Sequence, residues 1–262
     1  MQRHIPRKRF GQNFLRDEQI LSRIEHILNI QNQDQLVEIG PGQGALTDHL
    51  IQKGSSLTAV EIDRDLAAYL REKYHQPDFN LIEADALKFD FGKINGPIRL
   101  IGNLPYNIST PILFHLLKYK HNIRDMHFML QKEVVDRMIA PPNQKAYGRL
   151  SVMVQYHCDA KSLFNIPPHA FSPPPKVQSA FIRLVPYDAA THPYGEVDLT
   201  SFENVVRAAF SLRRKTIHNS LKPWLSNTDF NHLNLDPNLR PENLSVQDFV
   251  NIANYVHRHG TS

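Results

Sequence analysis

The tetrapeptide Asn103-Leu104-Pro105-Tyr106 combines residue types that suit alkylation of an exocyclic amine on a flat base. Such an amine is a poor nucleophile because its lone pair is delocalised into the ring. Two oxygen acceptors, the Asn103 side chain and the Leu104 carbonyl, would take its two N–H groups and draw the nitrogen towards tetrahedral geometry. Pro105 has no N–H and a fixed φ, so it can hold that carbonyl outward. The Tyr106 ring offers a stacking face that also stabilises developing positive charge.

The same four residues also fit an ordinary turn, in which Asn and Pro end a strand and Tyr is half-buried packing. Their surroundings favour the chemical interpretation. The apolar run 98–101 predicts a buried strand, and Ser109-Thr110-Pro111 predicts a helix start with proline in the first turn. A strand-to-helix loop lies at the carboxyl end of a sheet, where open α/β folds bind ligands.

A second strand-to-helix turn, Gly40-Pro41-Gly42-Gln43-Gly44, follows a strand predicted over 35–39. Its G-x-G-x-G spacing differs from the dinucleotide fingerprint, so it predicts close approach of backbone to a ligand without a pyrophosphate cradle. Glu61 ends the next predicted strand, where a ribose-diol acceptor belongs. Asp85 ends the third strand and suits an adenine amino group. Together they predict S-adenosylmethionine; NAD is the rival cofactor, and a purely structural turn is the alternative.

Strands and helices alternate along the first two thirds of the chain, which predicts an α/β fold with a doubly wound, mostly parallel sheet. Later residues read as helices only, which predicts a small helical second domain. We therefore expect domains over 1–187 and 196–262, with a linker at 188–195. The predicted strands are 35–39, 57–61, 80–84, 98–101, 126–130, 161–166 and 177–185.

A proline-rich segment, 167–176, separates the last two predicted strands. Two prolines precede Phe171 and three follow it, so the segment is stiff and cannot be a central strand. One use of such stiffness is to present Phe171 and Lys176 at low entropy cost. A rigid surface connection is the alternative.

Composition excludes several classes of protein. Cys158 is the only cysteine, so an internal disulfide and a thiolate zinc cluster are excluded, and the 14 histidines lack ligand-like spacing, so we expect no metal. No apolar run approaches the ~20 residues of a membrane span. The basic N-terminus has no apolar signal core, so we expect a cytoplasmic protein.

The net charge of +4 is concentrated at the N-terminus. Residues 1–16 carry five Lys/Arg and no acid, whereas residues 196–262 carry seven of each. Basic arms commonly bind nucleic acid, which predicts phosphate contacts here. A solubilising tail is the alternative, and the charge does not distinguish RNA from DNA.

Taken together, these motifs resemble the ribosomal RNA adenine N6,N6-dimethyltransferases, most closely the branch that acts on the bacterial small subunit. The resemblance spans the chain and rests on segments 11–15, 38–47, 103–106, 130–134, 171–177 and 210–221. It implies a seven-stranded sheet of the class I methyltransferase type and S-adenosylmethionine as cofactor. The implied substrate is a pair of adjacent adenosines in the 3′-terminal hairpin of 16S ribosomal RNA, within the small (30S) subunit. Large-subunit RNA and DNA adenine methyltransferases and a non-catalytic assembly factor are the alternatives.

The resemblance also implies roles for individual residues. Asn13 and Leu15 match positions at the cofactor entrance, and Asn103 matches the position beside the reacting methyl. The cofactor-binding set is Asn13, Leu15, Gly40, Gly42, Glu61, Asp85 and Asn103. The catalytic set is Asn103, Leu104, Pro105, Tyr106 and Phe171, with the two aromatic rings stacking on a flipped-out adenine. The RNA-binding set is Arg7, Lys8, Arg9, Lys176, Arg213, Arg214 and Lys215. We expect a monomer.

Overall fold

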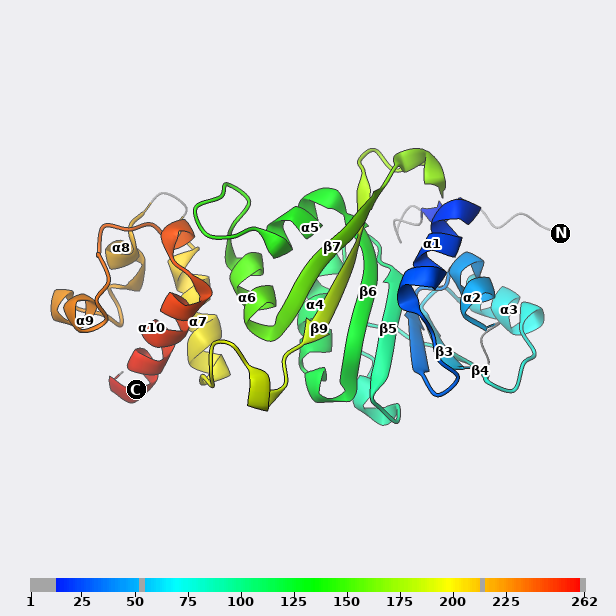
Figure 1. Ribbon diagram of the computed structural model, residues 1–262, viewed down its shortest axis with the longest axis horizontal. Helices are drawn as coiled ribbons and strands as arrows, with labels where there is room; N and C mark the ends of the chain where they lie inside the picture. Colours follow the sequence, from blue (N-terminus) through cyan, green and yellow to red (C-terminus); the bar gives the residue numbers. More distant parts are fainter. Residues whose placement is uncertain (1–12, 52–54, 213–214, 260–262) are drawn as a thin grey trace. The chain divides into compact units, whose positions relative to one another are not determined.

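The computed structural model describes residues 13–51, 55–212 and 215–259 (Figure 1). Contacts divide the chain into two compact units, one of Met1–Val135 with Lys161–Pro186 and one of Asp136–Ala160 with Tyr187–Ser262. These units differ from the domain limits expected from the sequence, because 136–160 and 188–195 group with the C-terminal helices. Whether the C-terminal residues form a domain with the predicted limits therefore stays a prediction.

A seven-stranded sheet forms the centre of the first unit, in the order β4-β3-β2-β5-β6-β9-β7. β4 to β6 are parallel in this order, and β9 is antiparallel to β6 (Figure 1). The predicted doubly wound, mostly parallel α/β sheet is confirmed. The strands are β2 (Gln35–Ile39), β3 (Ser56–Glu61), β4 (Phe79–Glu83), β5 (Ile98–Asn103), β6 (Ile123–Gln131), β7 (Cys158–Ile166) and β9 (Ser179–Pro186).

The helices of this part of the chain follow the expected alternation with strands. Asp17 caps the first helix by accepting from the backbone N–H groups of Gln19 and Ile20. This helix buries Leu21, Ile24 and Leu28, which join the core above the sheet. The helices are α1 (Glu18–Leu28), α2 (Ala45–Leu50), α3 (Arg64–Lys73), α4 (Ser109–Leu117) and α5 (Lys132–Ile139).

The chain order reverses between β2 and β5, which lie side by side. Ile39 at the end of β2 pairs with Val60 on one side and with Gly102 on the other. A Cβ at Gly102 would lie 2.6 Å from the Ile39 carbonyl oxygen, so glycine permits this close approach. The carboxyl ends of β2, β3 and β5 therefore meet at a topological switch point, where α/β sheets bind ligands.

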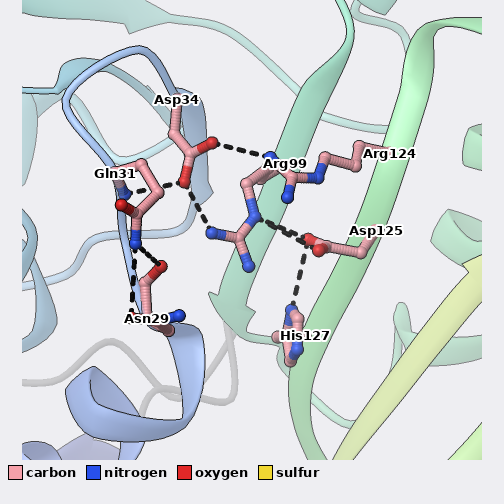
Figure 2. Close-up of polar contacts among 7 residues, drawn as sticks. All are labelled: Asn29, Gln31, Asp34, Arg99, Arg124, Asp125 and His127. Atoms are coloured by element: carbon pink, nitrogen blue, oxygen red, sulfur yellow. Dashed lines mark hydrogen bonds and ion pairs between the residues drawn. The ribbon is translucent and has the colours of Figure 1, made fainter.

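A buried ion cluster ties the strands together near their amino ends (Figure 2). Arg99 donates from Nε to both oxygens of Asp125, at 3.0 and 3.2 Å, and from Nη1 to Asp34 at 2.7 Å. Arg124 also donates to Asp34, at 2.9 Å, and His127 Nδ1 lies 3.4 Å from Asp125. Burial opposes the charge on Asp125, but the contact with His127 and the hydrogen bonds from Arg99 outweigh it and lower the pKa to about 2. The cluster thus links strands at their amino ends, and the carboxyl ends of the strands are left for ligands.

Two short strands were not predicted from the sequence, β1 (Phe14–Leu15) and β8 (Phe171–Ser172). They pair antiparallel, with Phe14 opposite Ser172 and Leu15 opposite Phe171. The Arg16 N–H extends this pairing by donating to the Ala170 carbonyl at 2.9 Å. The proline-rich segment is thus not a central strand, as predicted, but it supplies a partner for the residues that precede α1.

The second unit is helical in its C-terminal part, as predicted. Phe202, Val205 and Phe249 are fully buried there, and the Phe210 and Phe249 rings lie 5.6 Å apart. The helices are α6 (Arg149–His157), α7 (Leu199–Ala209), α8 (Ile217–Leu221), α9 (Asn227–His232) and α10 (Val246–His259). In the described parts of the chain, no helix has the length and apolarity needed to cross a membrane.

Candidate active site

A cavity of about 870 Å³ opens at the carboxyl ends of β2, β3 and β5. It gathers residues that are far apart in the sequence but were all predicted to belong to one site. Those that line it are Asn13, Leu15, Gly40, Gly42, Glu61, Asp85, Asn103, Leu104, Pro105 and Tyr106. The structure therefore brings the predicted cofactor set and the Asn-Leu-Pro-Tyr loop together, while the role of each residue stays a prediction.

The glycine turn presents bare backbone to this cavity. Gly40, Gly42 and Gly44 have φ angles of 67°, 60° and 84°, in the left-handed region that other residues rarely adopt. A Cβ at Gly42 would also lie 2.9 Å from the ring of Phe14. The turn is thus restricted both by its own backbone and by the strand packed on it, and it leads directly into α2.

Two carboxylates stand where β3 and β4 end. Glu61 is 4% exposed, and its oxygens accept from the N–H groups of Asp63 at 2.9 Å and Gly42 at 3.3 Å. Burial raises the pKa of Glu61, while these backbone bonds oppose the rise. Asp85 is half-buried and accepts from the Leu87 N–H at 3.0 Å. Both side chains are therefore held against the cavity, with acceptor capacity for hydroxyl or amino donors.

Glu38 lines the cavity too, although no role for it was predicted from the sequence. It is 1% exposed and accepts from Thr47 Oγ1 at 2.7 Å. Burial raises its pKa to about 8; the Thr47 bond opposes this and the charge of Glu61 adds to it. Glu38 therefore holds a proton at neutral pH. The available signal was an acid within the apolar strand that leads into the glycine turn.

The Asn103 side chain is fixed in one orientation. Its Nδ2 donates to the Asn13 carbonyl at 2.7 Å, so its oxygen is the part left to accept from a ligand. The loop itself is held by Leu104, whose N–H donates to the Met129 carbonyl at 3.2 Å, and by Pro105, whose carbonyl accepts from Ile108 N–H at 3.1 Å. An acceptor oxygen is thus preorganised at the cavity wall.

The two aromatic residues predicted to stack on a base are placed differently. The Tyr106 ring lines the cavity, and its hydroxyl lies 3.2 Å from Ser179 Oγ on β9. Burial raises the pKa of Tyr106, so its hydroxyl stays neutral. Phe171 is 4% exposed and packs in the core with Leu15, outside the cavity lining. The structure does not bring Phe171 to Tyr106, because β8 turns it inward.

The predicted RNA-binding cations are only partly within the described residues. Lys176 and Lys215 are exposed. Arg7, Lys8, Arg9, Arg213 and Arg214 lie outside the residues that the structure describes. Among the side chains that are described, no three metal-ligating groups come together.

Comparison with known proteins decides the family. Residues 3–258 match the family model described as ribosomal RNA adenine dimethylase. The chain belongs to this family. Two relatives, both called ribosomal RNA small subunit methyltransferase A, support the assignment. The protein of Hahella chejuensis (strain KCTC 2396) is 54% identical, with 98% of this chain and 94% of the relative covered. That of Legionella pneumophila (strain Corby) is 52% identical, with 97% and 99% covered.

Solved structures agree with the family in fold. A dimethyladenosine transferase from Plasmodium falciparum has a TM-score of 0.78 at 26% identity, over 91% of this chain and 95% of its own. The 23S rRNA methyltransferase ErmE has a TM-score of 0.73 at 24% identity, over 94% and 100%. The fold is thus that of class I methyltransferases, and the family resemblance stated from the motifs is confirmed.

Proposed function

We propose that this protein dimethylates the N6 amines of two adjacent adenosines in the 3′-terminal hairpin of 16S ribosomal RNA, within the small (30S) ribosomal subunit. Its methyl donor is S-adenosylmethionine. Family membership and relatives called small subunit methyltransferase A support this class of substrate. The observation that carries the proposal is the Asn103 amide, whose oxygen is set towards the same cavity that holds Glu61 and the glycine turn.

The cavity fits the proposed cofactor in shape and in charge. The left-handed glycines leave room at the turn for the methionyl part, Glu61 suits the ribose hydroxyls, and Asp85 suits the adenine amino group. A cofactor that carries a sulfonium and an ammonium matches a lining rich in carboxylates. When bound, S-adenosylmethionine supplies a methyl group on a good leaving group.

The protein's own residues then act by positioning and electrostatics. The Asn103 oxygen and the Leu104 carbonyl accept from the two N–H groups of the target amine, and the Tyr106 face stacks on the base. Glu38 holds its proton at neutral pH, so it adds no second negative charge beside Glu61. We assign no general base, since the alkylated amine is acidic enough to lose its proton to water.

For the RNA, we propose that the basic arm (Arg7, Lys8 and Arg9), Lys176 and the segment Arg213-Arg214-Lys215 supply phosphate contacts. We further propose a monomeric, cytoplasmic protein that uses no metal. The proposed substrate, ribosomal RNA of the small subunit, supports the cytoplasmic location, and the spacing of the histidines supports a reaction without a metal.

The experiment that tests the function is transfer of labelled methyl groups to small subunits that lack this modification. We expect label on the two adjacent adenosines of the 3′-terminal hairpin, with two methyl groups on each. Large subunits and duplex DNA serve as competing substrates in parallel reactions. Label in either of those, or none in small subunits, would contradict the proposal.

A further inference from the structure

We propose that β1 is a positioning strand that couples the glycine turn to the orientation of the Asn103 amide, with Phe14 as its main positioning residue. The proposal rests on the proposed function, because it concerns the geometry of the same methyl transfer. It concerns how Asn103 is held, rather than which groups touch the base.

The first observation is that three residues of segment 13–16, which contains β1, contact the glycine turn or the Asn103 side chain. Asn13 accepts through its carbonyl from Asn103 Nδ2 at 2.7 Å. The Phe14 ring packs where a side chain on Gly42 would stand. Arg16 donates from Nη2 to Gln43 Oε1 at 2.7 Å. The catalytic loop is therefore tied to one end of the segment and the glycine turn to its middle and its other end.

The second observation is that the segment is itself anchored. Phe14 and Leu15 pair with Ser172 and Phe171 in a two-stranded sheet, and Leu15 and Phe171 are both buried in the core. Phe14 is 9% exposed. A strand held by backbone pairing on one edge and by core side chains can transmit a displacement of the turn rather than absorb it.

The third observation is chemical. A side-chain amide has a donor nitrogen and an acceptor oxygen, and a backbone carbonyl can only accept. The Asn13 carbonyl therefore selects the orientation in which the Asn103 oxygen is free for the N6 amine. If the Asn103 amide rotated by half a turn, its NH₂ group would face the N–H groups of the target amine. The oxygen that accepts from that amine would then point away from it. The buried Phe171 contributes to this arrangement because it pairs with Leu15 and so helps to hold β1 in place.

A comparison of variants tests the Phe14 contact. Phe14→Ala should lower kcat by about 10- to 100-fold, in line with the sensitivity of catalysis to small misplacements. Its effect on the cofactor dissociation constant should be smaller. Phe14→Leu should recover most of the loss, since it refills the space over Gly42. Phe91→Leu is the matched control, because Phe91 is fully buried but lies outside the cavity lining. Equal losses of kcat in Phe14→Ala and Phe91→Leu would overturn the proposal.

A pH profile of Asn103→Asp tests the Asn13 contact. An ionised carboxylate cannot donate to the Asn13 carbonyl and is repelled by it, whereas the protonated acid donates with one oxygen and accepts with the other. The titratable or charged groups that line the same cavity are Arg16, Glu18, Glu25, Glu38, Asp48, His49, Glu61, Tyr69, Asp85 and Tyr106. The ionised carboxylates among them favour the protonated form of the introduced acid, and the wild-type profile corrects for the titration of the lining groups.

We expect the ratio of kcat for Asn103→Asp to that of wild type to rise as pH falls from 8.5 to 6. The rise should approach about tenfold per pH unit until the introduced carboxyl is protonated. A ratio that stays flat over this range would overturn the coupling. The wild-type reaction separates the two claims, since inactive wild-type protein refutes the proposed function, whereas active wild type with a flat ratio refutes only this inference.

Discussion

Glu61 shows how a single carboxylate can order a turn and a ligand together. Its two oxygens accept from the backbone at Gly42 and Asp63, and each oxygen has a further lone pair for a hydroxyl donor. The sequence located this residue from its place at the end of β3. It did not indicate the Gly42 contact, because that depends on how the glycine turn folds back over the strand end.

Glu61→Ala should weaken cofactor binding without unfolding the protein. Loss of charge-assisted bonds to two hydroxyls costs about 2–3 kcal/mol, which corresponds to ~30- to 150-fold in Kd. Calorimetric titration with S-adenosylmethionine measures this change. Glu83→Ala is the control, since Glu83 pairs with Glu61 in register but lies outside the cavity lining. An unchanged affinity in Glu61→Ala would exclude the ribose role.

Glu38 predicts a dependence of stability on pH. Its pKa rises on folding from 4.5 to about 8, chiefly because it is buried. The folded protein therefore holds a proton that the unfolded chain releases, and stability is lost as pH rises between these values, by up to ~1.4 kcal/mol per pH unit. Glu38→Gln keeps an acceptor for Thr47 but does not titrate.

The measurement is urea unfolding of wild type and Glu38→Gln at several pH values from 5 to 8. As pH rises, the free energy of unfolding of the variant should increase relative to that of wild type. Parallel curves for the two proteins would show that Glu38 does not hold its proton on folding.

At the scale of the elements, a buried cation, Arg99, links β5 to β6. The sequence shows a charged residue near the start of β5 but does not indicate its partners. Arg99 is 6% exposed and pairs with both Asp34 and Asp125, whereas Arg124 pairs with Asp34 from the surface. Breaking a buried pair leaves an unpaired charge and costs ~3–5 kcal/mol, while an exposed pair contributes ~0–1 kcal/mol.

Arg99→Met should therefore destabilise the protein by about 3–5 kcal/mol, and Arg124→Met by less than about 1 kcal/mol. Chemical denaturation of both variants at neutral pH checks this order. Similar losses in the two variants would mean that burial does not decide the strength of the cluster.

The elements that periodicity describes well were predicted, and those set by tertiary contact were not. The strands β2, β3, β5 and β6 carry apolar runs that are buried in the sheet. β1 and β8 have two residues each, too few for a pattern, and they exist because they meet in space. α9 has Phe230 as its one buried residue, so no apolar stripe marked it.

The residues that line the site could be predicted from the sequence, whereas the contacts that hold them in place could not. Strand ends of a parallel sheet converge, so Gly40, Glu61, Asp85 and Asn103 could be gathered from the sequence alone. The inward position of Phe171 and the bond from Asn103 to Asn13 could not, because both follow from the pairing of β1 with β8. That the proline-rich segment forms no central strand was correctly predicted, but the direction in which it turns Phe171 was not.

For the whole molecule, the basic arm predicts how binding to RNA responds to salt. Removing residues 1–9 deletes Arg3, Arg7, Lys8 and Arg9. Each phosphate contact adds about 0.7–0.9 to the slope of log affinity against log salt, so the slope should fall by up to ~3–4. Titration of small subunits at several salt concentrations measures it. An unchanged slope would place the phosphate contacts elsewhere, with Arg213-Arg214-Lys215 as the next segment to test.

The central claim is that the Asn103 oxygen acts on N6 most strongly as positive charge develops there. The most direct test is to measure kcat for methylation of small subunits and Kd for the cofactor with Asn103→Ala. An interaction that strengthens in the transition state affects kcat rather than KM. We expect kcat to fall by about 10²- to 10³-fold, by analogy with oxyanion-hole donors, while cofactor and RNA binding change little. A variant that turns over at nearly the wild-type kcat with only KM raised would contradict the account.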